Sequence, residues 1–161
     1  MLSLKIIDIK ETMAALLIGN VFDDFFVDEA QVTTFTKLIL SGQRNLSWYE
    51  GEEKEKFSTK HIFWKEIKPM VCSYIEGKKT PSSFRISLIA DGDFVKIRTG
   101  MEHISETGDY LIHFRFSDQE LFVVTGCAYR EFTMDKENEY AWDTAVKCLF
   151  KEKKLSFEES V

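Results

Sequence analysis

The stretch that decides the fold lies between residues 110 and 130 and reads YLIHFRFSDQELFVVTGCAYR. Apolar and polar side chains alternate along much of both halves, and this period of two is typical of a half-buried β-strand. The segment Ser117–Glu120 in the middle favours a turn, because Ser and Asp side chains readily bond to nearby backbone groups. We therefore predict an antiparallel hairpin made of residues 110–116 and 121–130.

Pairing Ser117 with Glu120 fixes the register of this hairpin. Ile112 and Phe114 then point to one apolar face, which has to be the core, whereas His113 and Arg115 point to the other face. The predicted cross-strand pairs are Phe114 with Val123, Ile112 with Thr125, His113 with Val124, and Arg115 with Phe122.

A second hairpin is predicted just upstream, from residues 84–90 and 94–99. These segments flank Asp91-Gly92, and Asp-Gly between alternating hydrophobic residues is a strong signal for a tight hairpin turn. A two-residue turn places Ile86 opposite Ile97 and Leu88 opposite Val95 on the core face, with Arg85 opposite Arg98 and Ser87 opposite Lys96 on the other.

The two hairpins independently predict one sheet face that collects basic side chains. Its members are Arg85, Lys96, Arg98, His113 and Arg115, with Arg130 further along. Arg pairs well with carboxylates and phosphates, so this face is a candidate site for an anion or an acidic partner. Like charges directly opposite each other destabilise a sheet unless a counter-charge intervenes.

Two simpler interpretations of the basic face remain open. The face can be an ordinary solvated sheet surface, with the long basic side chains covering Ile89, Phe94 and Phe122. Alternatively, an acidic helix of the same chain can neutralise it.

Helices are predicted on either side of these hairpins. Asp8 can cap a first helix, and a second is expected over about residues 62–76, with Pro69 either kinking it or marking its beginning. The last helix opens near Asp135, and residues 31–40 favour a strand. This order predicts an α+β fold with an antiparallel sheet of about five strands and helices on one face. The alternative is a curved sheet that grips the C-terminal helix around a ligand cavity.

The composition limits the class of protein. The 161 residues show no linker or repeat, so we expect a single domain over residues 1–161. The net charge of −6 disfavours a nucleic-acid binder that works by bulk charge. No segment is long and apolar enough to span a membrane, and the N-terminus lacks the pattern of a signal peptide. Three scattered cysteines favour a reducing, cytoplasmic setting.

The sequence offers no catalytic constellation and no metal-ligand pattern. Cys127 and His113 fall on neighbouring strands, but the predicted register points them to opposite faces, so a Cys–His dyad would require a loop one residue longer that reverses the alternation. The three His residues lack helical i,i+4 spacing, and no Cys-x-x-Cys occurs. We therefore expect no catalytic residues, no metal and no cofactor.

Several stretches resemble a family of small bacterial proteins that has no assigned activity. They are Asp28–Phe35, Trp64–Pro69, Ile75–Pro81, Thr125–Cys127 with Phe132–Lys136, and Trp142-Asp143. The resemblance covers nearly the full length and implies a cytosolic protein of anaerobic bacteria. It carries no catalytic signature, so it transfers no functional residue to this chain.

These observations favour a non-enzymatic binding or interaction protein whose basic sheet face takes an anionic ligand or an acidic protein partner. A small-ligand or enzymatic domain with a pocket between sheet and helices is the alternative. Self-association through a sheet edge, or through exposed Ile89, Phe94 and Phe122, is a third expectation.

Overall fold

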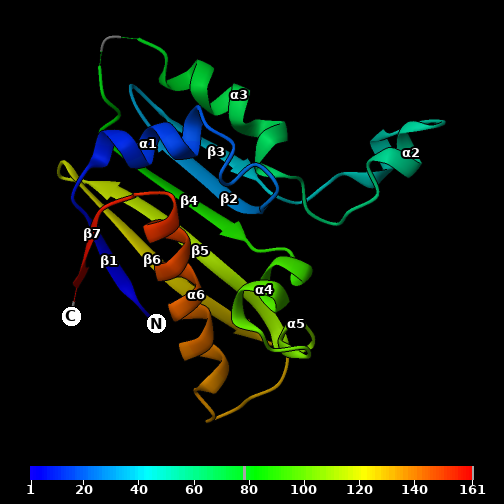
Figure 1. The fold of residues 1–161 in the computed structure, drawn as a ribbon. Coiled ribbons are helices and arrows are strands. Elements are labelled where there is room, and N and C mark those ends of the chain that lie inside the picture. Colours follow the sequence, from blue (N-terminus) through cyan, green and yellow to red (C-terminus); the bar gives the residue numbers. More distant parts are fainter. Residues whose placement is uncertain (78, 161) are drawn as a thin grey trace.

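The computed structural model describes residues 1–77 and 79–160, in which one antiparallel sheet carries helices on one face (Figure 1). Lys78, which belongs to the quoted Ile75–Pro81 stretch, and Val161 lie outside the described residues. The α+β class predicted from the hairpin pattern is confirmed.

The sheet has seven strands in the spatial order β3-β2-β4-β5-β6-β1-β7. They are β1 (Ser3–Ile6), β2 (Phe26–Thr33), β3 (Lys37–Ser41), β4 (Ser83–Ile89), β5 (Gly108–Ser117), β6 (Glu120–Tyr129) and β7 (Phe157–Ser160). The prediction of about five strands was wrong. Strands β1 and β7 have four residues each, too few to show a period, and the strand predicted over residues 31–40 contains a turn that separates β2 from β3.

The described residues contain six α-helices. They are α1 (Ile9–Leu17), α2 (Glu53–Lys56), α3 (Trp64–Ile75), α4 (Gly92–Thr99), α5 (Ile104–Thr107) and α6 (Glu137–Glu152). The predicted cap of α1 is confirmed, because the Glu11 amide donates to Asp8 Oδ1 at 3.1 Å. Helix α3 begins well before Pro69, which therefore does not mark its start. None of these helices combines the length and apolar character that crossing a bilayer requires.

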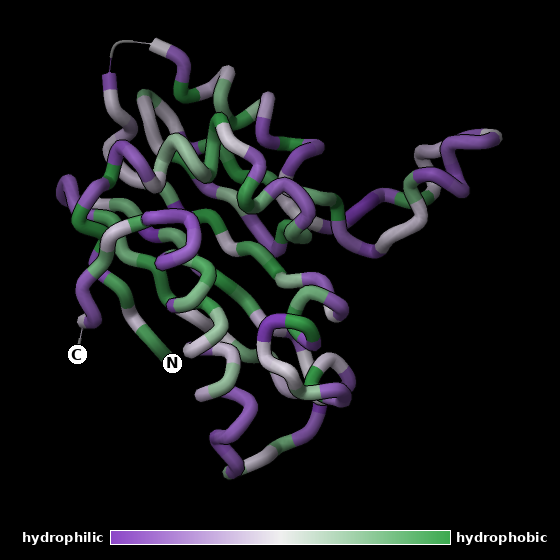
Figure 2. Tube along the Cα trace, viewed as in Figure 1, coloured by the Kyte–Doolittle hydropathy of each residue, from purple (hydrophilic) through white to green (hydrophobic). Residues whose placement is uncertain are grey.

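The hairpin of β5 and β6 forms in the predicted register. Ser117 pairs with Glu120, Phe114 with Val123 and Arg115 with Phe122. Ile112, Phe114 and Val123 are fully buried, so the predicted core face is confirmed. In Figure 2 the apolar stretches concentrate in these central strands, which β4 extends through its pairing with β5.

The predicted hairpin around Asp91-Gly92 does not form, because residues 92–99 fold as helix α4. Asp93 lies in the first turn of α4, Lys96 and Arg98 lie in its last turn, and this order of charges complements the helix dipole. Gly100 ends the helix with φ 71°, the left-handed conformation that glycine adopts easily. Ile97, which the alternation assigned to the core, is 81% exposed.

The space between the sheet and its helices is filled by large aromatic side chains. Trp64 from α3 and Trp142 from α6 are fully buried, and their indole nitrogens donate to backbone carbonyls. Fully buried Phe22, Phe114 and Phe150 pack between them and the strands. Helix α6 shares this face with α1 and α4 (Figure 1), so the sheet does not grip the C-terminal helix alone.

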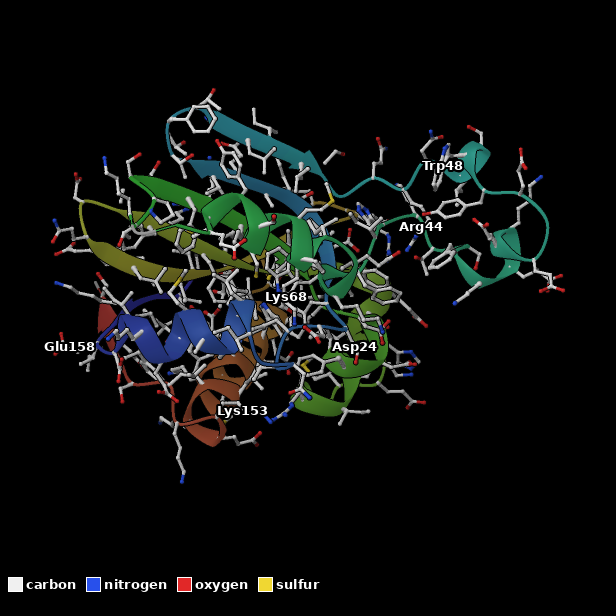
Figure 3. All side chains as sticks on the ribbon, turned by 90° about the horizontal axis from the view of Figure 1, so that it is seen from above. Asp24, Arg44, Trp48, Lys68, Lys153 and Glu158 are labelled. Carbon is white, nitrogen blue, oxygen red and sulfur yellow. The ribbon has the colours of Figure 1, made fainter. Side chains whose placement is uncertain are left out.

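A long excursion between β3 and α3, residues 43–61, projects from the body of the protein and is called the arm below (Figures 1 and 3). Arg44 anchors its base with a side chain that is only 1% exposed. The guanidinium donates to both carboxylate oxygens of Glu66 at 2.7 and 2.9 Å, to Tyr49, and to the backbone and hydroxyl oxygens of Thr59. It also lies over the ring of Phe57. One cation thus joins both ends of the arm to helix α3.

We predict that Arg44→Met loosens the arm and leaves the sheet intact. Losing one partner of a buried, hydrogen-bonded ion pair costs about 2–4 kcal/mol, and here the loss is local because Arg44 contacts the arm and α3. Amides of residues 43–61 should exchange with solvent far faster in the variant, while those of β5 and β6 keep their protection. Equal loss of protection in β5 and β6 would show instead that Arg44 supports the whole fold.

Candidate functional site

Among the described residues, no helix lies on the sheet face opposite α1, α4 and α6, and this face is called the open face below. One row of residues crosses all seven strands on this face, in the order Ile39, Gln31, Arg85, Arg115, Phe122, Lys5, Glu158. Arg85 and Arg115 stand at the centre of the row, directly opposite each other on β4 and β5. Both are exposed, so their charges face solvent side by side.

A shallow hollow of about 410 Å³ surrounds this arginine pair and also contains Lys37 from β3. The hollow is further lined by the polar side chains of Gln31, Thr33, Ser83 and Ser117. Within the described residues, Lys37, Arg85 and Arg115 have no carboxylate within ion-pair distance. Three unpaired cations beside hydroxyl and amide donors form a surface suited to an anion, and it is called the cationic hollow below.

His113 lies on the open face, one row away from the arginine pair. Its Nδ1 is 2.7 Å from the hydroxyl of Ser87. The ring packs against Gly126, where a Cβ atom would lie 2.9 Å from Nε2, so a side chain at this position would displace the imidazole. Burial and the charge of Arg115 lower the pKa of His113 from its ordinary value of 6.5, and Arg85 adds to this effect.

Two of the predicted site residues, Lys96 and Arg98, do not join the open face. Both lie on α4, which packs against α6 on the helix-bearing side of the sheet. Arg98 donates to Glu152 of α6 at 2.6 Å, so an acidic residue of a helix does neutralise this cation. Lys96 and Arg98 were assigned to the open face because a hairpin was predicted at Asp91-Gly92. Residues 92–99 form a helix, in which side chains do not alternate between two faces.

Arg130 is also separate from the cationic hollow. It follows β6, and its guanidinium donates to the backbone carbonyls of Ser105 and Glu106 at the end of the sheet. The structure therefore brings together Arg85, His113 and Arg115 from the predicted set, and it adds Lys37.

Lys37 was missed because residues 31–40 were interpreted as one strand. The turn of Thr34, Phe35 and Thr36 contains neither Gly nor Pro, so its sequence signal is weak. Recognising this turn would have placed Lys37 opposite Thr33, and hence on the same face as the arginines.

A separate cavity of about 610 Å³ lies where β6, α5 and the start of α6 meet. Thr107, Tyr129 and Asn138 contribute to its lining, and the Thr107 hydroxyl is 2.7 Å from that of Tyr110. The Tyr129 hydroxyl is buried with no hydrogen-bond partner within the described residues. Burial raises the pKa of Tyr129 above its usual range and the pKa of neighbouring Cys127 to about 11, so both groups stay protonated.

Within residues 1–77 and 79–160, no three His, Cys, Asp or Glu side chains are placed to hold a metal ion together. Cys127 pairs with Tyr110 in the ladder, on the face opposite His113, as the register predicted. The open face therefore carries a pair of facing arginines at its centre, with His113 one row away.

We predict that Arg115→Gln raises the free energy of unfolding by about 0.2–1 kcal/mol, because it removes a like-charge pair directly across two strands. Urea denaturation measures this change. Lys5→Gln serves as control, since Lys5 lies in the same row but pairs with exposed Glu120, and it should leave stability unchanged or lower it by less than ~1 kcal/mol. A loss of stability in Arg115→Gln larger than that of the control would contradict repulsion between the arginines.

His113 should make stability depend on pH. Its lowered pKa means that the unfolded chain binds the proton more readily than the folded protein does. Stability should therefore fall as the pH drops below 6.5, and His113→Gln should lose this part of the pH dependence. An NMR titration of the imidazole should give a pKa below 6.5 that rises in Arg115→Gln; a pKa unchanged by that substitution would contradict the assigned cause.

Comparisons with other proteins identify a family for this chain but give no activity. Neither a curated protein nor a solved structure matches this chain. Residues 15–158 match a family described as "Family of unknown function (DUF5721)". The matched range includes the arm and every residue of the cationic hollow. With nearly its whole length matched, the chain belongs to this family of unknown function.

Proposed function

We propose that this protein is a non-catalytic binding protein whose cationic hollow takes a carboxylate-rich segment of a protein partner. The observation that carries the proposal is the direct opposition of Arg85 and Arg115, neither of which has a carboxylate within 4 Å in the part of the chain that the structure describes. Such an arrangement costs stability in the free protein, and a bound anion removes that cost.

Several other cations of the chain have an acidic partner close by. Arg44, Lys68 and Arg98 each have a carboxylate partner within 4 Å, contributed by Glu66, Asp23 and Glu152. Lys5, on the open face itself, pairs with Glu120. Arg85 and Arg115 differ from these four cations, because they lie directly opposite each other in the ladder and neither has a carboxylate within 4 Å among the described residues.

The shape and charge of the hollow favour an acidic segment over other anions. A small molecule usually requires a concave site that buries most of its surface, whereas this hollow is shallow and lies on a sheet face. A nucleic acid requires a broad positive field, which a chain with net charge −6 does not supply. Guanidinium groups bind carboxylates through paired hydrogen bonds, and Thr33, Ser83 and Ser117 can donate further ones.

A second candidate function is the binding of a small polar molecule in the cavity beside Tyr129. The unpartnered Tyr129 hydroxyl favours it, because buried polar groups normally have partners. This candidate ranks second because the neighbouring Thr107, Tyr110 and Asn138 already bond to one another and so have fewer free groups for a ligand.

We predict that a short oligoglutamate peptide binds the wild-type protein in isothermal titration calorimetry. Replacing Arg85 and Arg115 together by Gln should weaken binding at least about tenfold, because two charge-assisted contacts are lost. Added salt should weaken binding of the wild type, since the contacts lie at the surface.

Lys5→Gln is the matched control, because it removes a cation from the same face but outside the hollow and should leave affinity unchanged. Equal loss in the control would point to bulk charge and reject the hollow as the site. A natural ligand whose binding survives the arginine changes but is lost in Tyr129→Phe would identify the cavity instead.

A further inference from the structure

The arm has the features of a segment that docks on another surface. It extends away from the sheet and its helices, as Figure 3 shows with Arg44 at its base and Trp48 further out. Leu46 and Trp48 are 50% and 73% exposed, although large apolar side chains normally pack inside. Because Arg44 fixes the base, the arm holds these side chains in place without a partner.

The tip of the arm is acidic. Residues 50–56 contain four Glu and two Lys, and none of these six side chains forms an ion pair within the part of the chain that the structure describes. The arm therefore presents unpaired acidic groups next to an exposed aromatic ring.

The cationic hollow has the opposite charge, and two exposed apolar side chains lie on the neighbouring strand pair of β2 and β3. Phe35, in the turn between β2 and β3, is 93% exposed, and Ile39 of β3 is 57% exposed. Lys37 lies between them in sequence and lines the hollow with Arg85 and Arg115. Acidic and apolar groups on the arm thus match basic and apolar groups at the hollow, which is the complementarity expected of a specific interface.

The hollow cannot be filled by the arm of the same molecule. Strand β3 begins at Lys37 beside the hollow and ends at Ser41, and the arm continues from there away from the sheet. The contacts of Arg44 with Glu66 and Thr59 hold the arm in this direction. An arm that reaches a hollow has to come from another molecule.

We propose that the arm of one copy of this chain binds the cationic hollow of a second copy. This inference rests on the proposed function, because it names the carboxylate-rich segment that the hollow receives. A two-fold axis relates the copies, so that each arm enters the hollow of its partner and the assembly closes as a dimer. Glu side chains of the arm tip then supply the missing counter-charges of Arg85 and Arg115.

The test is a charge swap followed by sedimentation equilibrium. An arm variant carries Glu52→Lys, Glu53→Lys and Glu55→Lys, and a hollow variant carries Arg85→Glu and Arg115→Glu. We expect the wild type to dimerise and each variant alone to associate at least about tenfold more weakly, since like charges then meet. An equimolar mixture of the two variants should regain dimers, because the reversed arm then meets the reversed hollow at one contact and the wild-type arm meets the wild-type hollow at the other.

A second triple variant controls for net charge. Glu76→Lys, Glu102→Lys and Glu131→Lys change three exposed acidic residues outside the arm and should dimerise like the wild type. Circular dichroism of every variant checks that it is folded, so that a lost dimer is not a lost fold.

The inference is overturned if the wild type stays monomeric at its highest soluble concentration, or if the mixed variants remain monomers. In either case oligoglutamate binding decides the proposed function separately. Binding that persists in a monomeric protein leaves the hollow as an acidic-segment site with a different partner, whereas absent binding rejects both.

Discussion

The alternation of side chains along β4 and β5 is the constraint on which the site depends. Ile86 and Phe114 are buried under the helices, at 1% and 0% exposure. Both belong to the hydrophobic core that the described residues form between the sheet and its helices. Their burial forces the next residues, Arg85 and Arg115, to the opposite face. Since Arg85 and Arg115 are paired in the ladder, no local adjustment separates them without shifting the register and exposing the core.

The arm depends on a different interaction, the paired hydrogen bonds between Arg44 and Glu66. Glu66 also accepts from the Phe63 amide and so caps the first turn of α3. Burial acts to raise the pKa of Glu66, but the Arg44 hydrogen bonds and the Phe63 amide outweigh it and lower the pKa overall. The carboxylate therefore remains charged at neutral pH, and it couples the start of a core helix to a segment outside the core.

Close packing of the backbone completes this anchor. Gly42 lies at the point where β3 passes into the arm, and a Cβ atom there would lie 1.7 Å from the carbonyl oxygen of Val27. Its amide donates to the carbonyl of Asp28, at the irregularity of β2. Only glycine allows this close approach. Gly42, directly before the arm, therefore helps to set the direction in which the arm leaves the sheet.

The sequence predicts the centre of this fold better than its edges, for physical reasons. Residues 110–130 alternate over two long strands, and their register followed correctly from one turn. After Asp91-Gly92 the rule of alternation gave a wrong strand. Apolar Val95 and Ile97 alternate with charged residues as in a strand, but the order of these charges and the glycine at position 100 favour a helix. The site was therefore predicted in part: Arg85, His113 and Arg115 share a face because β4 and β5 are adjacent, whereas Lys37 depended on a turn without Gly or Pro.

The positions of Lys96 and Arg98 on α4 leave a smaller cationic site on the sheet than the sequence predicts. The predicted face held five cationic or titratable groups spread over two hairpins, which a solvated surface explains well. In the structure Arg98 is neutralised by Glu152 and Lys96 lies on α4, whereas Arg85 and Arg115 line one hollow whose described lining contains no Asp or Glu. The arm has the opposite charge, because the four glutamates of residues 50–56 form no ion pair within the described residues. Cations that face each other in the hollow, and glutamates gathered at the tip of the arm, have the charge complementarity expected of two surfaces that meet.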